Sequence, residues 1–293
     1  MTHISRQEPI SRALHTPRTA IAAKSGSQRF RDGSETVVLL HSSASSGRQW
    51  DALVRCLQPD LHVHAIDLHG HGRRPAWCGD RTLSVVDEAA LALPILERAG
   101  GAHVIGHSYG AAIAIHLAAA QPGLVRSLTV FEPVLFNLLA EREPHGAAAL
   151  EVLAVARSVY RHVSAGRLTD AAEHFVNYWS GANAWERLGS HHQAVIASRM
   201  PAVTRHFDAL HAASLSAAEL ARLRMPMLCL TGAQSTLAAR RIGALLRALL
   251  PWATHESIAG LGHLGPITHP EVFNDRVLQF LEFPRSPLSL TGS

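Results

Sequence analysis

Gly106-His107-Ser108-Tyr109-Gly110 joins a short apolar run, 103–106, to an alanine-rich stretch, 109–120. The apolar run is typical of a buried strand, and the stretch after it consists almost entirely of strong helix formers. A sharp turn from a strand into a helix strains its central residue, and glycines two positions to either side give that turn room. The pattern predicts that the Ser108 hydroxyl is lifted clear of a sheet, beside the free N–H groups at a helix start.

Further apolar, β-branched runs alternate with long Ala- and Leu-rich stretches, which indicates an α/β fold: a mostly parallel sheet flanked by helices. The expected strands are 36–40, 62–68, 103–106, 127–132, 226–231 and 254–258. The expected helices are 49–57, one helix from Thr82 or Ser84 to Arg98, 109–120, 237–250 and 271–280, and 260–270 is expected to be a loop.

The segment 137–215 has a helical composition without a strand pattern. We interpret it as a helical cap inserted into a core formed by 31–136 and 216–283. Its aromatic residues either line an apolar pocket or form the cap's own core; they are Phe175, Tyr178, Trp179 and Trp185. The polar, arginine-rich segment 1–30 is expected to be a flexible leader, and 284–293 a loose tail.

Composition narrows the function classes. The 293 residues are 47% hydrophobic and 17% charged, and the net charge is +4. No long basic run and no long uninterrupted apolar stretch occurs, so neither a nucleic-acid nor a membrane partner is expected. The 3 cysteines are far apart, which favours a reducing, cytoplasmic location over a disulfide framework. No nucleotide motif or metal-ligand spacing is found, so we expect no cofactor and no metal.

Four segments together resemble the α/β-hydrolase family: Gly106–Gly110 resembles its nucleophile elbow, His41–Ser43 with Trp50 its oxyanion loop, Asp67–Arg73 its glycine-rich loop, and Gly262–Pro266 its late histidine loop. Their order agrees over 36–280. The resemblance implies the α/β-hydrolase fold with Ser108 as nucleophile. It also implies that the backbone N–H groups of Ser43 and Tyr109 bind the oxyanion, although Ser42 replaces the usual glycine.

His263 is the expected base, since a hydroxyl nucleophile needs a neighbouring proton acceptor. It follows the last strand, lies among glycines, and comes after Ser108 in the chain, as this fold requires. His107, inside the elbow, is expected to be a packed neighbour.

The acid departs from the family pattern because Ser235 stands where an Asp is usual. Glu132, at the end of the strand after the elbow helix, is the best candidate to orient His263. Asp208 is the second candidate. Asp67 is expected to pin its own glycine-rich loop.

These residues predict a serine hydrolase that cleaves a small or medium carboxylic ester or lactone through an acyl-enzyme. Two alternatives stay open at this point. One is a C–C bond hydrolase of the same fold. The other is a non-catalytic ligand-binding protein on a hydrolase scaffold, which the missing acid at Ser235 favours.

Overall fold

The computed structural model describes residues 35–58, 60–213 and 215–282. They contain a six-stranded, fully parallel sheet with the order β2-β1-β3-β4-β5-β6. The strands are β1 (Thr36–Leu40), β2 (His62–Ile66), β3 (Ala102–His107), β4 (Val125–Phe131), β5 (Met227–Gly232) and β6 (Thr254–Ile258). The predicted α/β architecture is confirmed, whereas the leader predicted for 1–30 and the tail predicted for 284–293 lie outside the described residues.

Helices follow or separate these strands. They are α1 (Asp51–Leu57), α2 (Val85–Ala89), α3 (Leu93–Ala99), α4 (Tyr109–Ala120), α5 (Phe136–Arg142), α6 (Ala147–Ser164), α7 (Leu168–Ser180), α8 (Ser190–His211), α9 (Ala217–Leu220), α10 (Leu237–Leu249), α11 (Gly265–Thr268) and α12 (Pro270–Glu282). Short 3₁₀ turns cover Gly47–Trp50 (η2) and Pro122–Leu124 (η3). No helix among the described residues is long and apolar enough to cross a lipid bilayer.

Two sequence predictions of helix extent were wrong. The single helix expected to end at Arg98 is two, α2 and α3, because Pro94 lacks an N–H and is accommodated in the first turn of a new helix. Ser84 caps α2, and its hydroxyl and the Asp87 carboxylate form a capping box. The loop expected over 260–270 contains the short helix α11.

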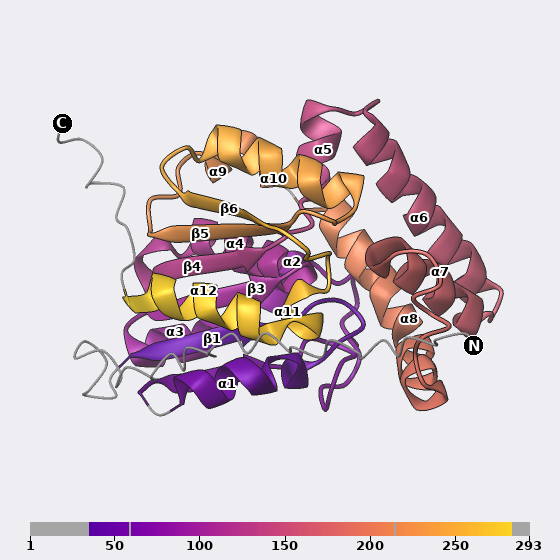
Figure 1. The fold of residues 1–293 in the computed structure, drawn as a ribbon, viewed down its shortest axis with the longest axis horizontal. Helices are drawn as coiled ribbons and strands as arrows, with labels where there is room; N and C mark the ends of the chain where they lie inside the picture. Colours follow the sequence, from indigo (N-terminus) through magenta and orange to yellow (C-terminus); the bar gives the residue numbers. More distant parts are fainter. Residues whose placement is uncertain (1–34, 59, 214, 283–293) are drawn as a thin grey trace, which may run out of the picture.

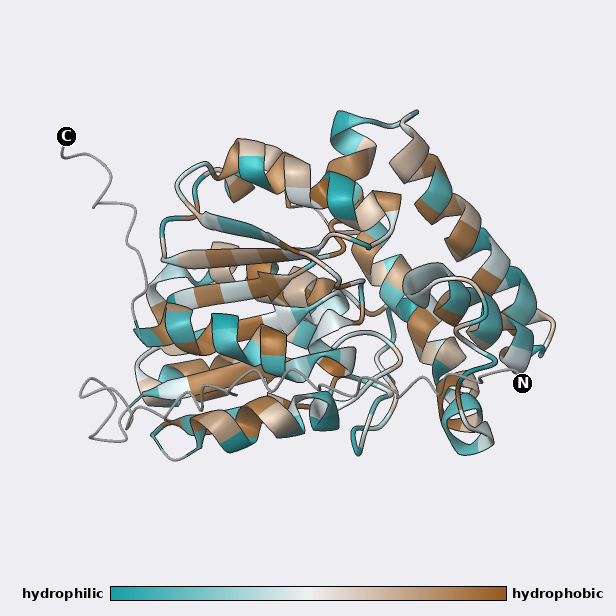
Figure 2. Ribbon diagram, viewed as in Figure 1, coloured by the Kyte–Doolittle hydropathy of each residue, from teal (hydrophilic) through white to brown (hydrophobic). Residues whose placement is uncertain are grey.

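Both faces of the central strands are buried, so their side chains alternate between two apolar layers. Val37 and Leu39 pack with Trp50 and Phe273, on the side of α1 and α12. Val38 and Leu40 face the other layer, which includes α4. Figure 2 shows the strands mostly hydrophobic and the helices carrying both kinds of residue, as a sheet covered on both sides requires.

The helices α5 to α8 gather at one end of the sheet (Figure 1). Side chains of α7 and α8 line a cavity together with Ser108, so these helices lie over the carboxyl edge of the strands. Segments that leave a parallel sheet at this edge converge, which is where ligands usually bind. The helical composition predicted for 137–215 agrees with the structure, while its role as a separate cap stays a prediction.

Candidate active site

Ser108 lies between β3 and α4 in the strained conformation that the sequence pattern predicts. Its φ of 56° and ψ of −115° lie outside the regions that residues with a Cβ usually adopt. The Ser108 N–H donates to the carbonyl of Phe131 at 2.9 Å, and the Ser108 carbonyl accepts from the Ala111 N–H at 3.1 Å. The turn is therefore held from β4 on one side and from the first turn of α4 on the other.

Gly106 and Gly110 permit this turn because backbone atoms come closer to them than a side chain allows. A Cβ on Gly106 would lie 2.5 Å from the carbonyl oxygen of Gly110, and one on Gly110 would lie 2.2 Å from that of Leu40. Neither approach is possible for a residue with a Cβ unless the backbone shifts. The two glycines thus give the turn its room by allowing backbone segments to come into close contact.

His263 reaches Ser108 from the loop between β6 and α11. Its Nε2 lies 2.9 Å from Ser108 Oγ, and the residue is 3% exposed. The indole of Trp179, on α7, stacks on the imidazole with ring centroids 4.1 Å apart. The imidazole is held in one place within reach of the hydroxyl proton, which is the geometry that a general base needs.

Glu132 follows β4 directly and lies against the far side of His263. Its Oε2 is 2.6 Å from His263 Nδ1. Because the carboxylate accepts from Nδ1–H, Nε2 is left to accept from the Ser108 hydroxyl. The structure brings Ser108, His263 and Glu132 into one hydrogen-bonded chain, whereas Asp208 bonds to the hydroxyl of Tyr160 instead.

The second oxygen of Glu132, Oε1, accepts from the Gly232 N–H at 2.6 Å and from the Ser235 hydroxyl at 2.5 Å. A buried carboxylate is costly unless hydrogen bonds replace its hydration, and these donors together with His263 do so. The sequence shows that Ser235 lacks a carboxyl group, but the hydrogen bond from its hydroxyl to Glu132 was not predicted. The position of Ser235 after β5, the strand beside β4, was the sequence signal from which this contact could have been predicted.

His107, inside the turn, has both ring nitrogens engaged. Its Nε2 donates to the carbonyl of His263 at 2.8 Å, and its Nδ1 accepts from the Gln49 amide at 3.0 Å. Burial, together with the neighbouring His263, holds the pKa of His107 well below its usual 6.5. This agrees with the prediction that His107 is a packed neighbour.

The Ser43 and Tyr109 N–H groups, expected to bind an oxyanion, both lie at the carboxyl edge of the sheet. Leu40 pairs with Gly106, so the loop after β1 and the turn after β3 leave the sheet side by side. Tyr109 is the first residue of α4 and has no acceptor within the helix. Among the described residues neither N–H has a hydrogen-bond partner, which leaves both available to a ligand oxygen.

Neighbouring loops fix the loop that carries Ser43. Asp67 Oδ2 accepts from the Arg73 N–H at 2.9 Å within its own loop, as predicted, and Oδ1 accepts from the Gly47 N–H at 2.8 Å. His71 Nε2 accepts from the Ala44 N–H at 3.1 Å. Ala44 has a φ of 58°, so these contacts hold a backbone conformation that residues with a Cβ seldom adopt.

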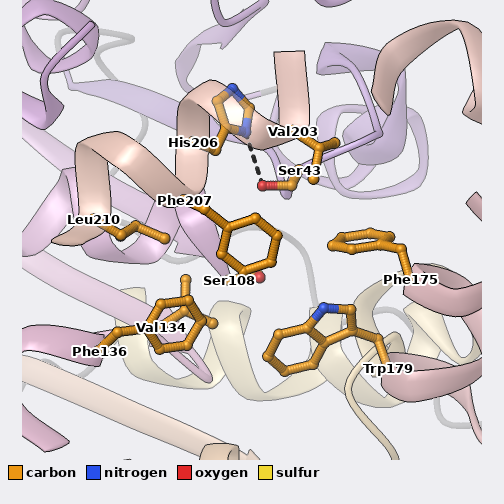
Figure 3. Close-up of a pocket in the computed structure, with 10 residues that line it drawn as sticks. All are labelled: Ser43, Ser108, Val134, Phe136, Phe175, Trp179, Val203, His206, Phe207 and Leu210. Carbon is orange, nitrogen blue, oxygen red and sulfur yellow. Dashed lines mark hydrogen bonds between the residues drawn. The ribbon is translucent and has the colours of Figure 1, made fainter. Parts of the chain in front are cut away.

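A cleft of about 870 Å³ opens over Ser108 and His263. A chamber of about 20 Å³ adjoins it, and the two share Ser43, Ser108 and two aromatic side chains of α7. Figure 3 shows the apolar side chains around the chamber: Val134, Phe136, Phe175, Trp179, Val203, Phe207 and Leu210. A cleft of this size accommodates a small organic molecule.

Both interpretations of the aromatic residues in 137–215 apply in part. Phe175, Tyr178 and Trp179 line the cleft, whereas Trp185 is buried in the hydrophobic core. Within 35–58, 60–213 and 215–282, no group of three or more His, Cys, Asp and Glu side chains is placed to hold a metal ion.

Two further side chains at this site were not predicted from the sequence. Gln49 Oε1 accepts from the Ser42 N–H at 3.1 Å, and the amide group of Gln49 also binds His107. His206, on α8, has its Nδ1 2.8 Å from Ser43 Oγ. No flanking glycines or strand end distinguish His206 among the 20 histidines, so the sequence offered no local signal for it.

Comparison with known proteins identifies the family of this chain. Residues 37–276 match the Alpha/beta hydrolase family. The chain is 27% identical over 265 residues to the pimeloyl-(acyl-carrier protein) methyl ester esterase of Yersinia enterocolitica, covering 86% of this chain and 95% of that enzyme. It is 38% identical over 103 residues to the lipase LipV of Mycobacterium tuberculosis, a match that spans 35% of this chain and 39% of the lipase.

Solved structures share the fold. A hydrolase from Pseudomonas aeruginosa PA01 superposes with a TM-score of 0.68 at 23% identity, covering 88% of this chain and 92% of that one. The enol-lactonase from Burkholderia xenovorans LB400 gives a TM-score of 0.68 at 18% identity, covering 87% and 94%. The family match spans the sheet and the strained turn at Ser108 alike. The chain is a hydrolase and belongs to the alpha/beta hydrolase family.

Proposed function

We propose that the protein hydrolyses a small or medium carboxylic ester or lactone through an acyl-enzyme on Ser108. The observation that carries this proposal is the chain from Glu132 through His263 to Ser108, which opens into the cleft. A serine hydroxyl is a weak nucleophile until a base takes its proton, and this arrangement supplies the base and the group that orients it.

In the first step, Ser108 Oγ attacks the ester carbonyl while His263 Nε2 accepts the hydroxyl proton. Glu132 stabilises the resulting imidazolium through Nδ1–H, and the N–H groups of Ser43 and Tyr109 bind the oxyanion. His263 then returns the proton to the leaving alcohol, and the acyl group stays on Ser108. A water molecule, activated by His263 in the same way, releases the acid and restores the hydroxyl.

The cavity suggests how an ester is bound. The apolar chamber of about 20 Å³ fits a group of about the size of a methyl, and the larger cleft takes the rest of the ester. The helices of 137–215 act as a cap that shields the site from water. The esterase from Yersinia, which matches over most of both chains, supports ester chemistry.

The free thiols of Cys56, Cys78 and Cys229 fit the cytoplasmic location expected from the sequence.

Labelling with a fluorophosphonate tests the nucleophile. We expect one adduct, mapped to Ser108 by peptide mass analysis and absent from Ser108→Ala, together with turnover of a neutral aryl ester that this variant loses. Glu132→Gln should lower kcat by about 10²–10⁴ while the fold is kept, because the imidazolium loses its partner. A folded protein that forms no adduct and turns over no ester or lactone would contradict the proposal and favour a ligand-binding role.

A further inference from the structure

A second hydroxyl faces the cavity of Ser108. Ser43 lines both the chamber and the cleft, and its Oγ lies 2.8 Å from Nδ1 of His206 on α8 (Figure 3). His206 is 1% exposed and lines the chamber, where its Nδ1 is bonded to Ser43 Oγ. Burying a polar imidazole costs desolvation free energy. Packing alone therefore does not account for a buried histidine that is bonded to an uncharged hydroxyl.

The imidazole of His206 is clamped in one plane. The ring of Tyr109 stacks on one face with centroids 3.9 Å apart and planes inclined by 15°, and the ring of His71 stacks on another at 4.8 Å and 23°. Stacked faces leave only the nitrogens at the ring edge to form hydrogen bonds. Because Tyr109 directly follows Ser108, the clamp also fixes His206 relative to the nucleophile.

The second nitrogen of His206 faces a buried carboxyl group. Nε2 lies 3.8 Å from Glu88 Oε1, and both residues are almost completely buried. Among the described residues, neither of these two atoms has a hydrogen-bond partner, although the other oxygen of Glu88 accepts from the His69 N–H at 3.2 Å. Two unpaired buried polar atoms are costly, and a small side-chain rotation that closes this gap would satisfy both.

We propose that Ser43, His206 and Glu88 form a second hydroxyl–imidazole–carboxyl chain, in which the Ser43 hydroxyl donates a hydrogen bond to the carbonyl oxygen of the bound ester. Ser43 touches the substrate, while His206 and Glu88 are positioning residues. This inference rests on the proposed ester hydrolysis and adds a side-chain donor to the two backbone N–H groups. Such donors stabilise the charge that develops in the transition state.

The protonation of Glu88 sets the direction of the chain. Burial raises the pKa of Glu88 to about 8, so its neutral carboxyl donates to His206 Nε2 near pH 7. Burial also holds the pKa of His206 well below 6.5, so the neutral ring carries its single proton on Nδ1 and donates to Ser43 Oγ. The hydroxyl proton of Ser43 is then left for the substrate oxygen.

Ionisation of Glu88 reverses the donor and acceptor in each hydrogen bond of this chain. The carboxylate then accepts from Nε2–H, Nδ1 accepts from the Ser43 hydroxyl, and only lone pairs of Ser43 face the oxyanion. The groups that face or act on Glu88 are His206 on α8, Tyr109 on α4, the His69 N–H and Arg74 from the loop after β2, and Asp87 on its own helix. The donor role is therefore lost as pH rises through about 8.

Steady-state kinetics on a neutral ester between pH 6 and 9.5 tests the chain, with Ser108→Ala as the blank. We expect wild-type kcat to fall as pH rises through about 8. Ser43→Ala should lower kcat at pH 7 by about 10-fold to 100-fold with little change in KM, and should remove the alkaline fall. Ser43→Thr, which keeps a hydroxyl, should retain more of kcat than Ser43→Ala.

Glu88→Gln separates positioning from structural support. A carboxamide donates to Nε2 at every pH, so we expect this variant to lose the alkaline fall and to exceed the wild type at pH 9. A merely structural role would lower kcat at all pH values. Ser108-dependent turnover in which Ser43→Ala keeps the wild-type kcat, or in which both variants keep the alkaline fall, would overturn the inference and leave the proposed function intact.

A second measurement does not depend on turnover. Nitrogen-15 NMR, assigned with His206→Gln, should show the Nδ1–H tautomer of His206 at pH 7 and the Nε2–H tautomer at pH 9. An Nε2–H tautomer at both pH values would overturn the chain directly. The expected tautomers without any Ser108-dependent turnover would contradict the proposed function, and the substrate role of Ser43 with it.

Discussion

Glu132 and Ser235 stand after neighbouring strands and face one another at 2.5 Å. The family pattern places the carboxylate at the Ser235 position. In this chain a hydroxyl stands at that position, and the carboxylate that contacts His263 follows the neighbouring strand, β4. Phe131 pairs with Leu230 across β4 and β5, so the segments that carry Glu132 and Ser235 leave the sheet at the same edge. The imidazole of His263 can therefore meet a carboxylate from either strand, provided that the other residue completes its hydrogen bonds.

Moving the carboxylate back to β5 tests this exchange. Glu132→Ser should lower kcat by about 10²–10⁴. Adding Ser235→Asp to that variant should recover at least about tenfold of the loss, since the carboxylate returns to His263. Ser235→Asp alone should be slower than the wild type, because two carboxylates then compete for one site. Ester turnover measures all three, with Tm as the folding control. A double variant no faster than Glu132→Ser would show that only β4 can present the acid.

The helix α8 forms one wall of the small chamber. Val203, His206, Phe207 and Leu210 recur at helical spacing and face the same cavity. Because Phe207 occupies the chamber wall with an aromatic ring, it limits the length of the group that the chamber accepts. The helix thus combines two tasks, since it bounds the chamber and delivers His206 to Ser43.

Phe207→Leu should therefore shift the preference towards longer acyl or alkyl chains. We expect the ratio of kcat/KM for a six-carbon over a two-carbon chain to rise by about 10-fold or more, as hydrophobic pockets discriminate by roughly 1–3 kcal/mol for a methylene. Val195→Ala, on the same helix but lining the cleft alone, is the matched control. An unchanged ratio in a folded Phe207→Leu would mean that the chamber holds neither side of the ester.

Some parts of the site could be predicted from the sequence and others could not. Ser108, His263 and Glu132 each follow a strand and are marked by glycine or proline and by a local change of pattern, so their positions at one sheet edge followed from parallel topology. The contact between Ser43 and His206 joins residues 163 positions apart. It depends on how α8 packs over the sheet, and amphipathic periodicity states which face of a helix is apolar without stating what that face will meet.

Buried histidines make the stability of the whole protein depend on pH. Burial lowers the pKa of His41 to about 3 and that of His71 to about 4, and it holds those of His107 and His206 well below 6.5. In the unfolded chain these side chains take up protons near pH 6.5. Below that pH the unfolded state binds more protons, so the free energy of unfolding falls as the pH falls.

Glu88 acts in the opposite sense. Burial raises its pKa from 4.5 to about 8, so Glu88 destabilises the folded state less as the pH falls. The four histidines outweigh this single group, so we expect Tm to fall by several degrees per pH unit between 6.5 and 4.5. His71→Gln should flatten the slope, whereas His191→Gln, at an exposed position, should not. Scanning calorimetry measures both. A Tm that stays level or rises on acidification would contradict the neutral state of the buried histidines.

The distribution of charge around the cleft selects among esters. Among the described residues that line it, Arg187 and Arg199 carry positive charge and none is Asp or Glu, while the whole chain has a net charge of +4. A cleft lined by one sign of charge attracts the opposite sign. We expect kcat/KM for an ester with a carboxylate to exceed that for its cationic analogue, and the difference to shrink at high salt.

Charge reversal on α8 and near it separates the local effect from the global one. Arg187→Glu should lower kcat/KM for the anionic ester by about threefold to tenfold and raise it for the cationic one, as charges near a partly solvated cleft interact over a Debye length. Arg205→Glu makes the same change in net charge on an exposed position of α8 outside the cleft lining. Equal effects of the two variants would attribute the preference to the net charge of the molecule, and a larger effect of Arg187→Glu would attribute it to the cleft.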